Sequence, residues 1–380
     1  MVVGAGPAGA FLGYLLASAG ARVTIIDKAT FPRDKVCGGG ISNKTVDLLP
    51  FDLSPIVHRR IASALLTYQN RDTVVKDLDR LGGVSVVRSE FDYFLLRKAI
   101  DAGARFNGDT TFDRLERRGD GVRITTSRGV FDARYAVGAD GVFSALRRSI
   151  FGPDLVAYAA AVEALVTVTS DKAERIGDRI LFDFGGMPRG YGWIFPKRDH
   201  LNAGVFSVFR SRALNAELST FMSRYRILDS PTRVRRFGFA IPVRNRPREY
   251  ERPHILLIGD AGGFAESFYG EGIYFALKSA RVAAEALMAG FDWPRDGAFT
   301  ALIRQRIQPD LSYSEINARI FFLLQTTGFS RMVRSVSVSD DFARLITGGL
   351  GHRACFYRTL LTVPRWLFSP HLPAFADGPL

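Results

Sequence analysis

The sequence predicts an α/β protein with three parts: a Rossmann-type dinucleotide-binding domain, an antiparallel-sheet domain and a helical C-terminal region. A glycine fingerprint, Gly4-Ala-Gly-Pro-Ala-Gly9, stands between a short apolar strand and a helix rich in small residues. Residues 156–243 alternate apolar and polar side chains over several runs, which is typical of an antiparallel sheet. A short apolar strand at 255–258 then precedes a long helical pattern, so the chain returns to its first domain.

The first 27 residues are expected to form a strand, a helix over 7–19 and a second strand over 21–26. The glycines allow a tight turn and let backbone N–H groups approach a pyrophosphate at the helix N-terminus. Asp27 follows the second strand, about 20 residues beyond the fingerprint, where a carboxylate accepts hydrogen bonds from a ribose 2′-OH. The residues expected to contact the nucleotide are Gly4, Gly6, Ala8, Gly9, Asp27 and Lys28.

Two later turns repeat the arrangement of strand, glycine and acid. Asp140 follows one strand and Asp260 another, and each carboxylate is suited to hold a ribose or ribityl hydroxyl. The helix predicted over 272–289 has its positive N-terminal end where it would face an anionic reduced flavin. Three such elements in this order predict a flavin dinucleotide. The expected contacts from these turns are Asp140, Gly259, Asp260, Gly270, Gly272 and Ile273.

Over residues 1–290 the chain resembles the FAD-dependent oxidoreductases of the p-hydroxybenzoate hydroxylase fold. The resemblance implies FAD bound through Gly6, Asp27, Asp260 and the 270–273 segment. Arg88, which begins a helix predicted over 88–102, matches a cofactor-contacting arginine of such proteins. The expected division is an FAD-binding domain over 1–50, 85–155 and 244–294, a substrate domain over 51–84 and 156–243, and a helical region over 295–380.

Two further motifs indicate a branch of this fold. The run from Pro32 to Cys37-Gly-Gly-Gly and the run Tyr191-Gly-Trp-Ile-Phe-Pro-Lys resemble the paired signatures of the geranylgeranyl reductase family. In that family the first motif places a cysteine loop near the flavin and the second lines a cavity for an isoprenoid chain. Members often continue with Gly-x-Gly, whereas here only Gly204 is present. The resemblance thus implies flavin contacts from Cys37, Gly38 and Gly39, and substrate contacts from Tyr191, Trp193, Phe195 and Pro196.

Cys37, Tyr191 and Trp193 are the candidate catalytic residues. Alternate residues of an extended segment share one face, so Tyr191, Trp193 and Phe195 would form a single aromatic stripe. By itself such a stripe is equally typical of a core, and a lone cysteine is usually a small buried hydrophobe. No histidine lies near Cys37 in the sequence, which disfavours nucleophilic catalysis.

The expected activity is FAD-dependent reduction of isolated C=C bonds in a polyprenyl group, with hydride from the reduced flavin. A flavin monooxygenase or halogenase is a second interpretation. Halogenases of this superfamily carry Trp-x-Trp-x-Ile-Pro, where this chain has Tyr191-Gly-Trp-Ile-Phe-Pro196. A third interpretation is a non-catalytic flavin-binding accessory protein, because a fold alone does not fix a function.

The chain has 51 basic and 38 acidic residues and a formal charge of +13, which favours anionic partners. No nucleic-acid-binding signature accompanies this charge. The electron donor is open between NADPH, NADH and a ferredoxin-like acidic carrier. Cys37 and Cys355 give no readable disulfide framework, so we expect a cytoplasmic protein. Apolar stretches at 318–324 and 354–372 leave peripheral membrane contact as a further option.

Overall fold

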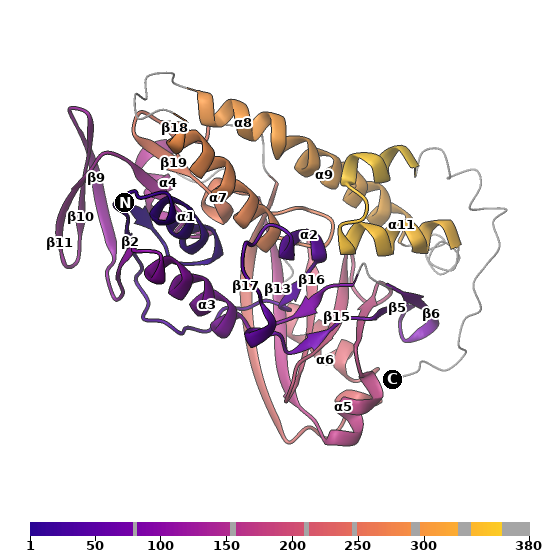
Figure 1. Cartoon of the computed structure of the whole chain (residues 1–380). Coiled ribbons are helices and arrows are strands. Elements are labelled where there is room, and N and C mark those ends of the chain that lie inside the picture. The colour runs from indigo at the N-terminus through magenta and orange to yellow at the C-terminus, as the bar shows by residue number, and fades with distance from the viewer. Residues whose placement is uncertain are drawn as a thin grey trace.

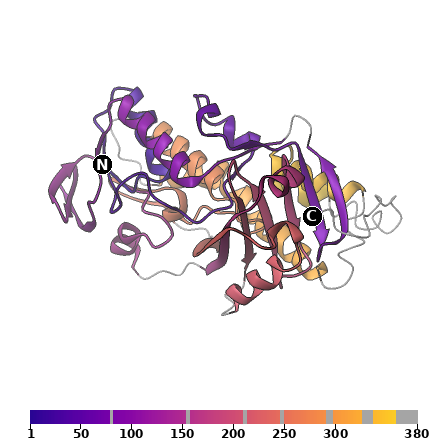
Figure 2. The ribbon, with the colours of Figure 1, turned by 90° about the horizontal axis from the view of Figure 1, so that it is seen from below.

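The computed structural model describes seven stretches of the chain, residues 1–78, 82–152, 157–208, 213–244, 249–289, 297–325 and 336–358. Two large sheets, each covered by helices, form most of the molecule (Figure 1). Seen from below, the three-stranded sheet β9–β11 projects at one end (Figure 2). The predicted α/β fold class is therefore confirmed.

A six-stranded sheet carries the glycine fingerprint. Its strands, in the order in which they lie side by side, are β18 (Glu251–Arg252), β19 (Ile255–Leu257), β12 (Ala136–Gly138), β1 (Val2–Val3), β2 (Thr24–Ile26) and β8 (Arg105–Asn107). All neighbours are parallel except β18 and β19. The second strand is shorter than the predicted 21–26, because it begins at Thr24. The sheet thus joins segments that are far apart in the sequence.

Three long helices pack beside this sheet: α1 (Pro7–Ser18), α3 (Arg88–Asp101) and α7 (Ile273–Met288). α1 contacts both of the others (Figure 1). Gly13 allows α1 to pack closely on the sheet, since a Cβ there would lie 2.5 Å from Cδ1 of Ile25 in β2. A shorter helix, α4 (Ala145–Phe151), follows β12 and is capped by Ser144, whose hydroxyl accepts from Arg147 N. The adjoining small sheet contains β9 (Phe112–Arg118), β10 (Gly121–Thr126) and β11 (Gly129–Ala133).

The second large sheet has seven strands. In order they are β17 (Arg233–Arg244), β13 (Ala157–Thr167), β16 (Leu201–Ser207), β15 (Gly190–Pro196), β14 (Arg179–Asp183), β5 (Ser63–Tyr68) and β6 (Arg71–Asp77). The pairing is antiparallel, as predicted, except between β14 and β5. That parallel pair arises because a long connection separates the two strands in the sequence.

Shorter elements surround the two sheets. Helices α5 (Ser170–Ile176) and α6 (Leu214–Met222) accompany the seven-stranded sheet, and Leu214, Leu218 and Phe221 enter its core. A second three-stranded sheet contains, in order, β3 (Gly40–Ile41), β7 (Val84–Ser85) and β4 (Arg59–Arg60). The remaining short helices are α2 (Asn43–Val46), η1 (Ser54–Ile56), η3 (Arg226–Leu228) and η4 (Gly259–Gly262).

The C-terminal part is helical in its described residues: α8 (Ala298–Arg306), α9 (Gln308–Leu324) and α11 (Val336–Thr347). Phe322 of α9 and Phe342 of α11 pack with Phe182 and Tyr191 of the seven-stranded sheet. Within the described part of the chain, none of the helices combines the length and apolar character needed to span a bilayer. Most of the apolar stretch at 354–372 lies outside the described residues. The domain boundaries stay a prediction.

Candidate active site

A cavity of about 640 Å³ is lined by residues of both large sheets. Most of the predicted cofactor and substrate residues reach it, although they come from distant parts of the sequence. These are Gly4, Gly6, Ala8, Asp27, Lys28, Cys37, Gly38, Gly39, Arg88, Asp140, Asp260, Gly270, Gly272, Ile273, Tyr191, Trp193 and Phe195. Gly9, Gly259 and Pro196 do not line it.

The fingerprint turn is a backbone cradle that only glycine permits. Gly4 has a φ of +106°, and a Cβ there would lie 2.2 Å from the carbonyl oxygen of Ala139. A Cβ on Gly9 would lie 1.9 Å from the carbonyl oxygen of Gly4, so glycine at this position lets the turn close although Gly9 does not line the cavity. Asp27 is fixed at the end of β2 because its carboxylate accepts from Ala5 N at 2.7 Å and Ala29 N at 2.9 Å.

The two later acids are placed differently. The Asp140 carboxylate accepts from Ser144 Oγ at 2.5 Å and Ala145 N at 2.7 Å, so it secures the start of α4 as well as lining the cavity. Asp260 also lines the cavity, and no hydrogen bond to its carboxylate is found among the described residues. Burial raises the pKa of Asp260, against the opposing charges of Lys35 and Arg88. A buried carboxylate in this setting is suited to accept from a ligand hydroxyl.

Arg88 begins α3 inside the molecule, with only 9% of its surface exposed. Its Nε and Nη2 atoms donate to the two carboxylate oxygens of Asp92 at 2.7 and 2.8 Å. The pair satisfies a charge that would otherwise be costly to bury. Arg88 also interacts with the Cys37 side chain, so it connects α3 to the loop that carries the thiol.

Residues 37–40, here called the cysteine loop, pack directly on strand β15. A Cβ on Gly38 would lie 2.6 Å from Cδ2 of Phe195, and one on Gly39, whose φ is +68°, would lie 2.1 Å from the carbonyl oxygen of Val86. The thiol of Cys37 accepts from Gly39 N at 3.3 Å. The cysteine motif and the Tyr191–Lys197 motif are therefore in physical contact.

An aromatic wall forms the apolar end of the cavity. Tyr191, Trp193 and Phe195 alternate along β15 and share the face that lines it. Phe182 and Phe206, which were not predicted from the sequence, complete the wall, and the ring centroids of Phe206 and Tyr191 are 5.4 Å apart. Phe206 occupies the second glycine position of the family's Gly-x-Gly, so this departure adds a ring to the wall.

Gly204 occupies the first position of that pattern for a steric reason. A Cβ there would lie 2.1 Å from Cζ2 of Trp193, which is its partner across the β15–β16 pair. Pro196 ends β15 outside the cavity, and its carbonyl oxygen accepts from Ser85 Oγ at 2.8 Å. The glycine thus makes room for the indole ring, while the proline terminates the wall.

Three buried polar residues behind the cysteine loop were not identified from the sequence as functional. Lys197 Nζ donates to Gly38 O at 2.7 Å, Ser85 Oγ at 2.6 Å and Val86 O at 2.9 Å. Burial lowers the pKa of Lys197 to about 7. Lys197 is the last residue of the second motif, so its place in that motif was the signal in the sequence that could have identified it.

Glu163 and Asn202 complete this group. Glu163 Oε2 accepts from Cys37 N at 3.1 Å and from Asn202 Nδ2 at 3.0 Å, and Asn202 Oδ1 accepts from Trp193 Nε1 at 2.7 Å. The polar group therefore couples the cysteine loop to the aromatic wall. The signal in the sequence was a lone acid inside the apolar run 157–167.

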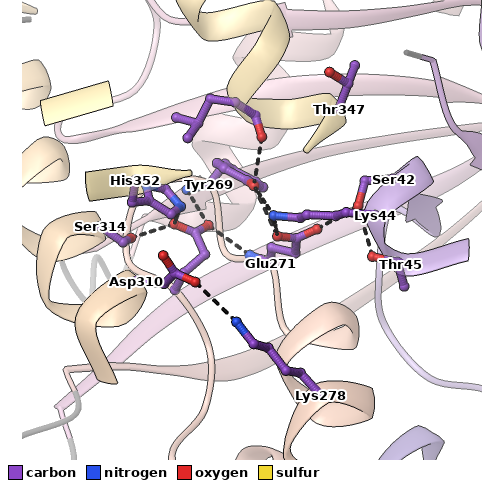
Figure 3. A network of polar contacts seen from close by, with 12 residues as sticks. Ser42, Lys44, Thr45, Tyr269, Glu271, Lys278, Asp310, Ser314, Thr347 and His352 are labelled. Carbon is purple, nitrogen blue, oxygen red and sulfur yellow. Dashed lines mark hydrogen bonds and ion pairs between the residues drawn. The ribbon is translucent and has the colours of Figure 1, made fainter. Parts of the chain in front are cut away.

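A second loop, residues 266–272 and here called the acidic loop, leads into α7 (Figure 3). Glu266 is fully buried, and its carboxylate accepts from Phe268 N at 2.7 Å, Tyr269 N at 2.8 Å, Glu271 N at 2.9 Å and Ser314 Oγ at 2.6 Å. Burial raises the pKa of Glu266. One carboxylate thus shapes the turn that presents Gly270 and Gly272 to the cavity.

Charged and aromatic side chains fasten the outside of the acidic loop. Lys44 Nζ lies 2.6 Å from Glu271 Oε2, and the Tyr269 hydroxyl donates to the same carboxylate at 3.0 Å (Figure 3). His352 is buried beside Glu266 with 3.5 Å between Nε2 and Oε2, and neither ring nitrogen has a hydrogen-bond partner within the described part of the chain. Burial lowers the pKa of His352 to about 4, so the ring is neutral near pH 7.

Comparison with known proteins places these features in a family. Residues 1–171 match the family described as an FAD binding domain. A geranylgeranyl diphosphate reductase of Rhodobacter capsulatus is 31% identical over 76% of this chain and 74% of its own. A menaquinone reductase of Mycolicibacterium smegmatis is 28% identical over 86% of each chain.

Solved structures agree on the fold. A geranylgeranyl bacteriochlorophyll reductase-like protein of Thermoplasma acidophilum superimposes with a TM-score of 0.76 and 18% identity, covering 97% of this chain and 96% of its own. The halogenase PltM gives a TM-score of 0.70 with 16% identity, covering 92% of this chain and 85% of its own. Reductases and halogenases therefore share this architecture, and the fold alone does not separate their chemistry.

The residues present fit FAD. The glycine cradle of Gly4 leaves room for a pyrophosphate at the start of α1, and Asp27 and Asp260 offer carboxylates at two further points of the cavity. The family match and the reductase relatives agree with this fit. The chain therefore belongs to the geranylgeranyl reductase family of FAD-dependent oxidoreductases.

Proposed function

We propose that this protein reduces isolated C=C bonds in a polyprenyl group. The observation that carries the proposal is the contact between the cysteine loop and the aromatic wall, inside a cavity that also reaches the fingerprint turn. An apolar chain lying on the wall would bring a double bond beside the loop. The names of the reductase relatives, which refer to geranylgeranyl groups and menaquinone, support the same substrate class.

The chain's own residues would bind, orient and exclude water. Reduced FAD, when bound, supplies a hydride. We assign the pyrophosphate to the turn at Gly4–Gly9 and hydroxyl groups to Asp27 and Asp260. An unactivated alkene has no carbonyl to polarise, so the rate would depend on proximity and on a dry, apolar site.

The three candidate catalytic residues would take different parts. The Tyr191 hydroxyl donates to the carbonyl oxygen of Tyr269 at 2.6 Å, and burial raises the pKa of this phenol well above its ordinary value. We therefore assign Tyr191 the role of a wall residue that steadies the acidic loop, rather than that of a proton donor. Trp193 would orient the chain, and Cys37 would hold the cysteine loop against the flavin and the substrate.

The test is an anaerobic reaction of the reduced protein. We expect geranylgeranyl diphosphate to reoxidise the flavin without oxygen, and mass spectrometry to find two added hydrogens for each reduced bond. The saturated phytanyl analogue serves as the control and should leave the flavin reduced. Reoxidation that requires oxygen, with a hydroxylated or halogenated product, would overturn the proposal. Repeating the cycle with NADPH, NADH or a reduced ferredoxin identifies the donor.

A further inference from the structure

Glu163 is a single carboxylate in an otherwise apolar strand, and it lies at the wall of the cavity. Along β13, Ala161 and Glu163 line the cavity, while Val162 and Ala164 enter the core on the opposite face of the sheet. Only 3% of Glu163 is exposed. Its Oε2 accepts from the cysteine loop and from Asn202, whereas Oε1 has no hydrogen bond among the described residues.

Among the described residues, the titratable groups that face Glu163 come from three neighbouring segments. They are Cys37 of the cysteine loop, Lys197 at the end of β15 and Arg88 at the start of α3. Its partners in the adjacent strands, Gly204 and Phe237, carry no charge. Burial raises the pKa of Glu163 although Lys197 and Arg88 oppose the shift, so the neutral acid persists to higher pH than for an exposed glutamate.

Reduction of a C=C bond consumes a proton as well as a hydride, so the reaction needs a group at the cavity that can give up a proton. The Tyr191 hydroxyl is already bonded to Tyr269 O. The three N–H groups of Lys197 are bonded to Gly38, Ser85 and Val86. Glu163 combines a free oxygen, burial and a position beside the loop.

We propose that Glu163 donates the proton that completes the reduction. This inference rests on the proposed function. The double bond gains a proton from the Glu163 carboxyl group at one carbon and the hydride of the reduced flavin at the other, so two C–H bonds replace the π bond. The flavin loses two electrons, and Glu163 is left as a carboxylate that takes a proton from solvent before the next cycle. The aromatic wall would stabilise positive character on the second carbon.

The test compares E163Q with the wild-type protein in the anaerobic single turnover. Glutamine keeps the acceptor for Cys37 N but cannot supply a proton. Loss of a general acid lowers the rate by about 10²–10⁴-fold, and we expect that decrease for E163Q. The wild-type rate should fall as pH rises through the pKa of Glu163, which gives the pH–rate profile an alkaline limb. E163Q should lack this limb. The control is D183N, which removes a buried carboxylate of β14 that does not line the cavity and should keep the limb.

Two measurements separate proton donation from a structural role. In infrared titrations without substrate, the wild-type minus E163Q difference should contain a protonated carboxyl band that disappears as pH rises. Alkylation of Cys37 should proceed equally fast in both proteins, because the loop keeps its position. An E163Q protein that retains the rate and the alkaline limb would overturn the inference alone, as would a limb that C37S removes and E163Q does not. A wild-type protein that transfers no hydride to any polyprenyl substrate would overturn the proposed function as well.

Discussion

The cysteine loop and the acidic loop line the same cavity but are held by different means. Side chains from the seven-stranded sheet hold the cysteine loop: Glu163 accepts from it, and Lys197 donates to it. The acidic loop is held by one of its own residues, Glu266, whose carboxylate accepts hydrogen bonds from three backbone N–H groups of the loop. Outer support comes from Ser314 of α9 and Lys44 of α2.

This difference indicates which kind of substitution should disturb each loop. A Cβ added at Gly38 or Gly39 would clash with Phe195 or Val86. The geometry of the cysteine loop therefore depends on this close packing. The acidic loop depends on one buried carboxylate and on a neutral histidine beside it. Steric changes should therefore disturb the first loop, and changes of charge should disturb the second.

Glu266→Ala should have the largest effect. Three backbone N–H groups and the Ser314 hydroxyl lose their acceptor, and each buried unsatisfied donor costs about 1–3 kcal/mol. We expect the free energy of unfolding in urea to fall by about 4 kcal/mol or more, with loss of bound flavin. The control Glu315→Ala removes an exposed pair with Arg319 and should change stability by less than about 1 kcal/mol. Equal effects of the two variants would contradict the role of Glu266.

Acid should destabilise the acidic loop through His352. The folded protein lowers the pKa of this ring from 6.5 to about 4, so the unfolded chain takes up a proton first as pH falls. The stability is complete above pH 6.5 and is lost between there and about pH 4, by about 3 kcal/mol in all. His352→Phe keeps a ring beside Tyr269 and should abolish this part of the pH dependence. Parallel stability–pH curves for the two proteins would refute the assignment.

Gly39→Ala should disturb the cysteine loop. The new Cβ would overlap the carbonyl oxygen of Val86 and approach Lys197 Nζ at 2.8 Å. Gly20→Ala is the matched control, because Gly20 also has a positive φ, +83°, but nothing lies within 4 Å of its Cβ position. Overpacking makes Gly39→Ala about 1–3 kcal/mol more destabilising than the control. An equal decrease in the free energy of unfolding for both variants, measured by chemical denaturation, would mean that the cysteine loop accommodates the new Cβ without strain.

Trp193→Phe should have the smallest effect on stability, about 1 kcal/mol, because it removes one buried hydrogen bond to Asn202. Its effect on substrate should be larger than its effect on folding, since the indole is part of the aromatic wall. Isothermal titration with a polyprenyl ligand measures the loss of affinity, and urea unfolding measures the loss of stability. Tyr93→Phe, on the exposed face of α3, should change neither quantity.

The sequence predicted the local parts of the site better than its supporting contacts. Gly4, Gly6 and Asp27 follow from chain geometry, because a turn that must approach a phosphate requires glycine at fixed offsets. Glu163 and Asn202 could not be found in this way, since their contacts with Cys37 form only when β13 and β16 pair. The parallel pairing of β5 with β14 was missed for the same reason, because neither strand pattern specifies its neighbour.

The order of the six-stranded sheet also bears on how the protein is made. β12 lies between β1 and β19, so β19 can join this sheet only after residue 257 has been synthesised. A ribosome that has released the first 150 residues has exposed β1, β2, β8 and β12 before β19, which pairs with β12, and α7, which packs on α1, have been made. Pairing between such distant segments is slow, and the incomplete sheet has an open edge prone to aggregation. From this strand order we expect a nascent chain that ends before β19 to aggregate more readily than one that extends past α7.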